Sequence, residues 1–513
     1  MHTLSLSNKK YIFIFLVCIL LGTVQFISLP MHTLDTDFFW HYKLGEEIVK
    51  THNVVLSNTL SFLTGTEWIP QEWLYEVVIY LLVSAGGMAA FCLIYAVNSI
   101  FQYLLAGRMS KPSNYVLFSI CVFIVLLGTP RNAGNRPAEL SIYLFPAIIF
   151  LYKMESKWKP LYFILLGIFT ANFHGGCILV MTALYVLLFA ANFIMDAYEQ
   201  TYSGSKYYLD RIIDFVLFLA ACCINPAGIR LLTTIPKISG LSSTAFISEW
   251  QSIQNSYGLC IVIVLICMSF GYALYKKHFI REDVINILIL AALLILGLCS
   301  GKAFMIFDIV WLCYGYKYLE DMLTDLFLGH ILISKKTHFL FLFALFPAAI
   351  IFSSKITKPI FQIVQEDFIT YANSTTSETI LAELKTNYSD STRILASYTD
   401  ANYLVLNNMK CFVDTRQWPY AKELGSCDAV DELFYISSNP LDYDAIDQFL
   451  GKYQFDYIWC ANGLALDDYL KSCPEYELVI EDNLNRSASE SDTADLPIYE
   501  RDSSLRQSLW KRI

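Results

Sequence analysis

The sequence predicts a polytopic α-helical membrane protein of about eleven transmembrane helices, followed by a C-terminal α/β domain. Hydrophobic residues make up 56% and charged residues 16% of the 513 residues, whereas a soluble domain is about 45–50% apolar and about 25% charged. Residues 1–355 carry a net charge of +3 and residues 356–513 a net charge of −13. A membrane-embedded part, 1–355, followed by an acidic soluble part, 356–513, accounts for both observations.

Apolar runs account for the predicted helices, because about 20 apolar residues cross a bilayer. The runs are 11–29, 88–106, 114–128, 139–152, 161–172, 177–194, 212–223, 258–275, 284–300, 303–316 and 337–352. The first run is long and lacks a small-residue cleavage site, so it predicts a retained helix rather than a signal peptide.

A shorter apolar run, 74–84, decides on which side each later loop lies. If this run is an interfacial helix and not a crossing, one set of loops holds 14 Lys and Arg in 66 positions and the opposite set holds seven in 106. The positive-inside rule therefore favours the interfacial assignment. It predicts a cytoplasmic N-terminus, a long first outer loop over 30–87 and an extracytoplasmic C-terminal domain.

The C-terminal part alternates short β-rich runs with polar helical stretches, which predicts an α/β layer domain. The expected strands are 393–396, 411–413, 457–459, 478–480 and 498–500, and the expected helices are 428–436 and 442–451. Cys411, Cys427, Cys460 and Cys473 lie here without the spacing of a zinc site, and whether they form disulfides stays open. No nucleic-acid-binding motif is present.

The first outer loop holds the most concentrated polar chemistry. Asp35, Asp37 and His41 follow the first span directly, and Glu72 precedes the interfacial helix. Carboxylates and an imidazole at such a position can provide a general base or ligands for a metal ion. The alternative is that Asp35 and Asp37 only cap the following helix, since Asp is a favoured N-cap residue.

Other candidate residues fall on the same predicted side of the membrane. Arg131 and Arg136 lie in a predicted outer loop, although Lys and Arg are scarce in the outer loops as a group. The planar guanidinium of Arg matches the geometry of phosphate oxygens. The alternative is an interfacial anchor, or an ion pair of Arg136 with Glu139. The remaining candidates for substrate binding are Asn135, His174, Glu249 and Lys302, near Gly and Pro residues that interrupt the spans.

The order of these motifs resembles a group of bacterial polytopic proteins among the GT-C glycosyltransferases, which include protein O-mannosyltransferases and oligosaccharyltransferases. The motifs are DTDFFWHYKLGEEI at 35–48, QEWL at 71–74, RNAGNRP at 131–137, NFHGG at 172–176, INPAG at 224–228, ISEW at 247–250 and CFVDTR at 411–416. The resemblance covers most of the chain.

The resemblance implies an enzyme of the bacterial cytoplasmic membrane that moves a hexosyl or pentosyl group from a polyprenyl-phosphate donor to an extracytoplasmic glycan, lipid or protein acceptor. Asp37 or Asp35 would act as general base, and Arg131 and Arg136 would hold the leaving phosphate. His41, His174, Glu72 and Glu249 would shape the sugar pocket, and Lys302 would be a second phosphate contact. A WWDYG-like motif is absent from the sequence, which speaks against transfer to asparagine.

The resemblance leaves the cofactor open. Asp35 and Asp37 can bind Mg²⁺ or Mn²⁺ only together with further ligands such as His41, Glu72 or donor phosphate oxygens. For the DTR segment at 414–416, a structural Asp–Arg turn is favoured over an acceptor contact.

Two rival functions come from other classes. A secondary transporter predicts inverted repeats and charges near the midplane of the bilayer, and the sequence has no repeats. A non-catalytic scaffold of the cell envelope would keep the architecture without activity, and retention of both first-loop acids argues against it.

Overall fold

The structure is a computed structural model. It describes residues 6–28, 34–128, 135–201, 204–241, 244, 257–276, 281–325, 363–424, 427–438, 442–462, 465–482 and 507–513.

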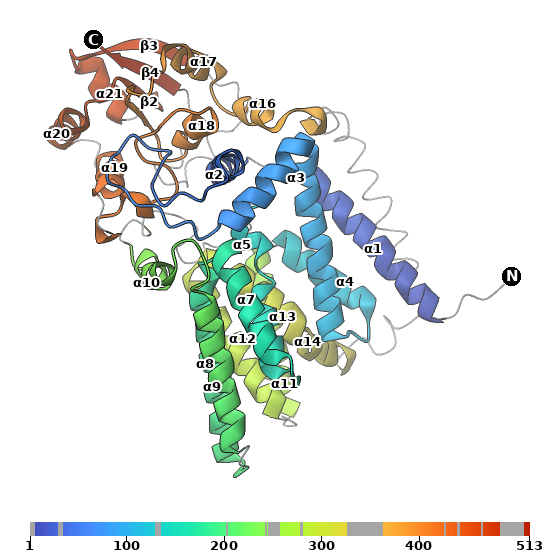
Figure 1. The fold of residues 1–513 in the computed structure, drawn as a ribbon. Coiled ribbons are helices and arrows are strands. Elements are labelled where there is room, and N and C mark those ends of the chain that lie inside the picture. The colour runs from blue at the N-terminus through green and yellow to red at the C-terminus, as the bar shows by residue number, and fades with distance from the viewer. Residues whose placement is uncertain are drawn as a thin grey trace.

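The first two thirds of the described chain form a helical bundle (Figure 1). Its helices include α1 (Leu6–Ser28), α3 (Trp73–Ser110), α4 (Tyr115–Gly128), α6 (Leu144–Lys153), α7 (Lys159–Phe173), α8 (Cys177–Tyr198), α9 (Ser205–Ala221), α11 (Tyr257–Lys276), α12 (Arg281–Cys299) and α13 (Gly301–Tyr314). Four further helices in this part of the chain are α2 (Asp37–Thr51), α5 (Pro137–Leu140), α10 (Ile229–Ile238) and α14 (Tyr316–Leu323).

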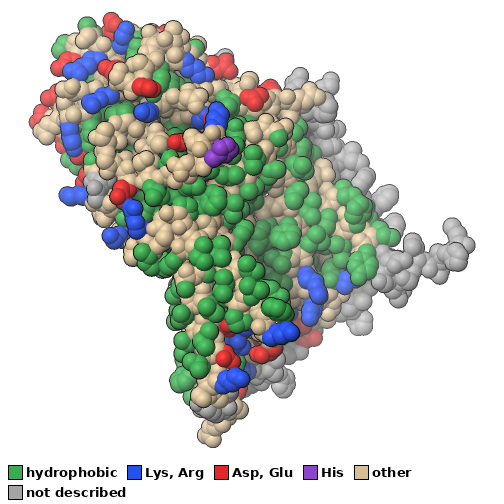
Figure 2. Space-filling view, in the orientation of Figure 1, with side chains coloured by type: hydrophobic (Ala, Val, Ile, Leu, Met, Phe, Trp, Pro, Cys, Tyr) green, Lys and Arg blue, Asp and Glu red, His purple; other side chains and the backbone are tan. Residues whose placement is uncertain are grey.

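Long apolar helices indicate an integral membrane protein. Four helices of the described chain are long and apolar enough to span a membrane, namely α1, α3, α8 and α12, and α4, α7 and α13 contain shorter apolar segments. Figure 2 shows hydrophobic side chains covering the middle of the bundle. Each predicted run within the described residues coincides with helix, although 139–152 is divided between α5 and α6. The run 337–352 lies outside the described residues.

A bend in α3 separates the predicted interfacial segment 74–84 from the predicted span 88–106. Gly87, at φ 54° and ψ −145°, interrupts the helical backbone there. Only glycine adopts this conformation readily, and a Cβ atom would lie 2.8 Å from the carbonyl oxygen of Glu366. The two halves of α3 therefore run in different directions (Figure 1).

The C-terminal region combines one sheet with short helices. The strands are β1 (Ile394–Ala396), β2 (Tyr457–Ala461), β3 (Tyr476–Asp482) and β4 (Gln507–Arg512), in the order β1-β2-β4-β3. The β1–β2 pair is parallel, and the two pairs that include β4 are antiparallel. The helices are α16 (Phe368–Asn373), α17 (Glu378–Asn387), α18 (Ala401–Leu406), α19 (Ala429–Ser438), α20 (Tyr443–Tyr453) and α21 (Ala465–Ser472), with the 3₁₀ turns η5 (Trp418–Tyr420) and η6 (Lys422–Leu424).

Most of the predicted elements of this region are present. The strands expected at 393–396, 457–459 and 478–480 correspond to β1, β2 and β3, and both predicted helices correspond to α19 and α20. The strand predicted at 411–413 is wrong, because Cys411 makes only a single bridge, to Ser61 of the first loop. The prediction at 498–500 lies outside the described residues. Among the described residues, no disulfide links Cys411, Cys427, Cys460 and Cys473.

The first loop lies between the bundle and the C-terminal region. Helix α2 packs on both α3 and α18. Backbone and side-chain hydrogen bonds tie the loop to the C-terminal region: the N–H of Cys411 donates to the carbonyl of Leu60 at 3.1 Å, and the hydroxyl of Ser61 donates to the carbonyl of Phe412 at 2.8 Å. The segment with the candidate acids is thus held from both sides.

Candidate functional site

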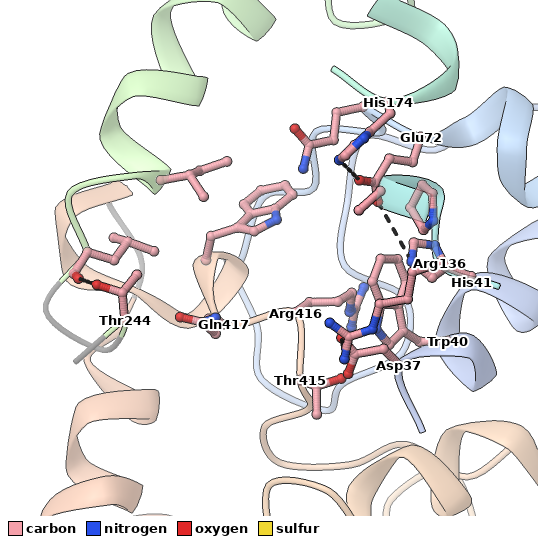
Figure 3. A pocket seen from close by; sticks show the side chains of 16 residues that line it. Asp37, Trp40, His41, Glu72, Arg136, His174, Thr244, Thr415, Arg416 and Gln417 are labelled. Carbon is pink, nitrogen blue, oxygen red and sulfur yellow. Dashed lines mark hydrogen bonds and ion pairs between the residues drawn. The ribbon is translucent and has the colours of Figure 1, made fainter. Parts of the chain in front are cut away.

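A pocket opens where the bundle, the first loop and the C-terminal region meet (Figure 3). Several of the residues that line it were singled out in the sequence. The pocket is lined by Asp37, Trp40, His41, Gln71, Glu72, Arg136, Pro137, Ala138, His174, Ile238, Leu241, Thr244, Thr415, Arg416, Gln417 and Trp418.

Arg136 joins the two acids of the first loop. Its Nη2 lies 2.7 Å from Oδ2 of Asp37 and donates to Oδ1 of Asp35 at 2.9 Å, and its Nε is also paired with Asp35. Asp35 in addition accepts from the backbone N–H of Asp37 at 3.0 Å. Asp35 is thus largely engaged in holding the start of α2, whereas Asp37 lines the pocket.

Two histidines and two glutamates form a second cluster at the wall of the pocket. Glu72 lies between the histidines, with Oε1 3.3 Å from His174 Nε2 and Oε2 3.8 Å from His41 Nε2 (Figure 3). On its other ring nitrogen, Nδ1, His41 lies 3.6 Å from Oε1 of Glu76. Glu76 is fully buried, one helical turn after Glu72.

Helical spacing brings this cluster together. Glu72 and Glu76 are four residues apart at the start of α3, and His41 and Gly45 are four residues apart in α2, so each pair lies on one helix face. Gly45 allows the two helices to meet, because a Cβ atom there would lie 2.1 Å from the carbonyl oxygen of Glu76. This close approach places the ring of His41 against α3.

The NFHGG motif orients His174 by docking on the QEW segment. The indole N–H of Trp73 donates to Asn172 at 2.6 Å, and the N–H of Gly175 donates to the carbonyl of Gln71 at 2.9 Å. His174 Nδ1 lies 2.6 Å from the hydroxyl of Ser141 and 3.0 Å from Cys177 Sγ. These contacts fix the ring so that Nε2 faces Glu72.

The C-terminal region forms the opposite wall through the DTR segment. The buried guanidinium of Arg416 donates to Asp414 from Nε at 2.8 Å and from Nη2 at 2.5 Å, and to Asn58 at 2.7 Å. The hydroxyl of Tyr420 donates to Asp414 at 2.7 Å, and Arg416 stacks 4.9 Å from the ring centroid of Trp68. The predicted structural role of this turn agrees with these contacts, yet Arg416 also lines the pocket.

Burial and neighbouring charges shift the pKa values of Arg416 and Tyr420 in the wall formed by the C-terminal region. Burial alone would lower the pKa of Arg416, but the neighbouring Asp414 outweighs it and raises that pKa above its ordinary value. Burial raises the pKa of Tyr420 well above its usual range, which keeps its hydroxyl protonated. Arg416 therefore stays a cation, held in place by a neutralising carboxylate.

A strained turn presents Gln417 to the pocket. Its backbone has φ 51° and ψ −67°, and the N–H of Trp418 donates to the carbonyl of Arg416 at 2.6 Å, which is a γ-turn with positive φ. Such a turn is rare and costly for a residue with a side chain, and backbone strain of this kind concentrates at functional sites.

Apart from Asp35, which pairs with Arg136 beside the pocket, the predicted site residues separate into three groups. Asp37, His41, Glu72, Arg136 and His174 converge on the pocket. Asn135 instead lies buried behind it, where its amide donates to the carbonyl of Phe91 at 2.7 Å, so it positions the loop and is not placed to contact substrate. Arg131, Glu249 and the side chain of Lys302 lie outside the described residues.

Sequence reasoning missed several residues of the site. Glu76 could have been found from its four-residue spacing to Glu72. Trp40 and Gln71 directly adjoin residues that were singled out, and both line the pocket. Gln417 and Trp418 reach the pocket only through long-range packing, such as the stacking of Trp418 on Trp68 with ring centroids 4.7 Å apart.

Comparisons with known proteins support a shared fold. No protein family model matches the chain, and no curated protein matches it by sequence. The oligosaccharyltransferase of Archaeoglobus fulgidus in its apo form has a TM-score of 0.54 at 9% identity, over 88% of this chain and 70% of that one. The same enzyme tethered to an acceptor peptide with an NVT sequon has a TM-score of 0.54 at 10% identity, over 88% and 69%.

A second protein of known structure matches nearly end to end. ArnT from Cupriavidus metallidurans in the apo state has a TM-score of 0.51 at 11% identity, over 99% of both chains. The expected resemblance to the GT-C glycosyltransferases is therefore confirmed at the level of the fold.

Proposed function

We propose that this protein is a membrane glycosyltransferase that moves a sugar from a polyprenyl-phosphate donor to an extracytoplasmic acceptor. The observation that carries the proposal is the convergence of Asp37, Arg136 and Arg416 on one pocket at the end of an apolar bundle. A carboxylate and guanidinium groups in one pocket suit a reaction in which a proton leaves the acceptor and negative charge builds on a phosphate.

The proposal includes the predicted orientation, with the pocket outside and about eleven spans. Three ion pairs support it by joining the basic loops of the bundle to one another: Lys153 with Glu282 at 3.2 Å, Arg211 with Glu155 at 3.2 Å, and Arg281 with Asp196. Helices α2 and α10, which contribute residues to the pocket lining, lie at the other end of the bundle (Figure 1). We assign the basic end to the cytoplasm, because Lys and Arg gather on that side of bilayers.

Asp37 is the better general base of the two first-loop acids, because it lines the pocket and Asp35 does not. In the proposed step, Asp37 takes the proton of the acceptor hydroxyl and the acceptor oxygen bonds to the anomeric carbon of the sugar. The bond between that carbon and the phosphate oxygen breaks, and polyprenyl phosphate leaves with its electron pair.

Arg136 has a double role in this proposal. Its contacts at 2.7 Å and 2.9 Å hold Asp37 and Asp35 together. A guanidinium has five N–H donors, so the same group can also contact a phosphate oxygen of the leaving group. Arg136 can thus hold the general base Asp37 and at the same time stabilise the negative charge that develops on the leaving phosphate.

Turnover of lipid-linked donors tests the proposal. Purified protein in lipid nanodiscs is incubated with a panel of radiolabelled polyprenyl-phosphate sugars, and release of polyprenyl phosphate is followed. We expect the wild type to consume one of these donors and Asp37→Asn and Arg136→Ala to lose that activity. Glu67→Gln, which changes an exposed carboxylate paired with Arg230, is the matched control and should keep it.

Failure to bind or consume any such donor would contradict the proposal. Transport of a small solute by the wild type, without donor cleavage, would favour the secondary transporter instead.

A further inference from the structure

Outside the Asp37–Arg136 pair, the described residues hold a group of metal-ligating side chains at the pocket wall. His41, Glu72 and Glu76 each offer one ligand atom, and these atoms all lie within 4.8 Å of one another. All three side chains are buried. The group combines both ends of the first loop, since His41 belongs to α2, Glu72 is the N-cap residue of α3 and Glu76 lies in its first turn.

The spacing of these atoms suits a small cation. Ligand atoms about 2.0–2.2 Å from a tetrahedral zinc ion lie roughly 3.4 Å from one another. His41 Nε2 lies 3.8 Å from Glu72 and the other ring nitrogen, Nδ1, lies 3.6 Å from Glu76. One ligand atom of each of the three residues lies within 4.8 Å of the other two. Side-chain rotations that shorten these separations would bring one histidine nitrogen and two carboxylate oxygens to the geometry of the ion.

Glu76 supplies an independent reason to expect a cation. Its side chain has no exposed surface, and neither of its oxygens accepts a hydrogen bond within the described structure. An ionised carboxylate buried in this way costs several kcal/mol unless a cation or donors compensate it. The second carboxylate, Glu72, adds negative charge one turn away and increases the need for compensation.

The surroundings resemble those of a metal site in other respects. His174 faces the other oxygen of Glu72 at 3.3 Å and is itself fixed by Ser141 at 2.6 Å, the kind of outer contact that orients a ligating carboxylate. His41 and Glu72 line the pocket, so an ion there would have one side open to a substrate. Three protein ligands and an open position are typical of catalytic metal ions.

We propose that His41, Glu72 and Glu76 bind one divalent transition-metal ion at the wall of the pocket. A mixed imidazole and carboxylate set favours zinc and manganese over magnesium, and zinc over manganese. This places the ion away from Asp35 and Asp37, between which the guanidinium of Arg136 already lies. Binding of the ion does not depend on the proposed transferase reaction. A contact between the ion and the donor phosphate would rest on that proposed function.

Metal content and affinity of the full-length protein test the proposal. The protein is purified in nanodiscs with its affinity tag removed, stripped with a chelator, and dialysed against Zn²⁺, Mn²⁺ or Mg²⁺. Bound metal is measured by mass spectrometry and affinity by calorimetry. We expect one Zn²⁺ per chain, weaker binding of Mn²⁺, no stoichiometric Mg²⁺, and a higher Tm with Zn²⁺.

Variants locate the ion. Glu76→Gln and His41→Ala should each weaken Zn²⁺ binding at least tenfold. Glu320→Gln is the matched control, because Glu320 is also a buried carboxylate but accepts backbone hydrogen bonds from Ser113 and Asn114 at the far end of the bundle. Asp37→Asn should bind Zn²⁺ like the wild type while losing transfer, so failure of the metal site and failure of the proposed reaction give different results.

The proposal is overturned if the stripped wild type takes up no Zn²⁺ and shows no shift in Tm, as expected if Glu76 is held as a neutral acid. It is also overturned if Glu76→Gln binds Zn²⁺ with wild-type affinity. Should Glu76→Gln fail to fold, the wild-type measurements and His41→Ala decide the question.

Discussion

The two ends of the helical bundle both bury charged side chains, but they balance the charges differently. At the end away from the pocket, Asp214 lies 3.5 Å from Lys159 and 3.7 Å from Arg211, so one carboxylate has two cations. At the pocket end the ratio of cations to carboxylates is reversed, because the single guanidinium of Arg136 pairs with both Asp35 and Asp37. Glu72 and Glu76 likewise share His41, and a second histidine, His174, pairs with Glu72.

This difference separates a structural role from a functional one. Removal of a buried carboxylate that is paired with cations is strongly destabilising, because it leaves buried positive charge without compensation. Carboxylates crowded around too few cations cost stability, and such arrangements concentrate at sites that bind or transform ligands. Substitutions at the two ends should therefore have opposite consequences for activity and stability.

Asp37→Asn should have the largest effect of all on activity. Loss of a general base lowers turnover by about 10²–10⁴-fold, while Arg136 keeps its contacts with Asp35 and the fold is retained. Turnover of the donor and the Tm of the same preparation check this. Wild-type turnover in a folded Asp37→Asn variant would exclude Asp37 as the general base.

Asp214→Asn should show the opposite pattern. Among the described residues, its removal leaves Lys159 buried without its carboxylate and leaves Arg211 with only the exposed Glu155, and breaking a buried ion pair typically destabilises by about 3–5 kcal/mol. Thermal unfolding in nanodiscs should report a lower Tm, and the folded fraction should turn over donor at the wild-type rate. An Asp214→Asn variant with wild-type stability and no activity would contradict the structural role assigned to this end of the bundle.

Gly45→Ala tests whether the close approach of α2 and α3 supports the second cluster. The added methyl group meets the carbonyl oxygen of Glu76, so the helices must separate. Overpacking of this kind costs about 1–3 kcal/mol. We expect a lower Tm together with weaker Zn²⁺ binding, and Gly451→Ala, whose Cβ meets open space, is the control.

Gln417→Gly should stabilise the fold slightly while impairing substrate binding. Glycine adopts the positive φ of the γ-turn without strain, which is worth about 1 kcal/mol. The variant loses the side chain that lines the pocket. We predict a slightly higher Tm and a raised KM; an unchanged KM would make the turn purely structural.

Glu46→Gln should have the smallest effect, and one that depends on pH. Burial raises the pKa of Glu46, but hydrogen bonds from Lys43 and Lys50 outweigh this and lower it below its ordinary value. A lowered folded-state pKa means that the stabilisation is present above the unfolded-state pKa of about 4.3 and is lost as the pH falls through the folded-state value. Because the pair is partly exposed, we expect less than about 1 kcal/mol at pH 7 and no difference in Tm from wild type in strong acid.

Local patterns were enough to predict the bundle and five of the residues that line the pocket. Apolar runs and the charge bias of the loops depend on neighbouring residues only, and Asp37, Arg136 and His174 stand out within short motifs. The predictions failed where distant segments meet. The run 411–413 has the composition of a strand, yet it pairs at a single point with Ser61, more than 300 residues away in the chain.

The contribution of the C-terminal region to the pocket was missed for the same reason. Arg416 appears in the sequence as part of a short polar turn. Its place in the pocket depends on Asn58 and Trp68 of the first loop, which hold the guanidinium from the other side. Neither contact has a signature in the sequence around residue 416.

A structure with a bound donor analogue would show whether Asp37 and Arg136 face the reacting atoms of the donor. The protein is reconstituted in nanodiscs and imaged by cryo-electron microscopy with a polyprenyl-phosphonate sugar, whose carbon linkage prevents cleavage. We expect the phosphonate within hydrogen-bond distance of Arg136 and the anomeric carbon facing Asp37. A donor analogue bound elsewhere, with the pocket unchanged, would contradict it.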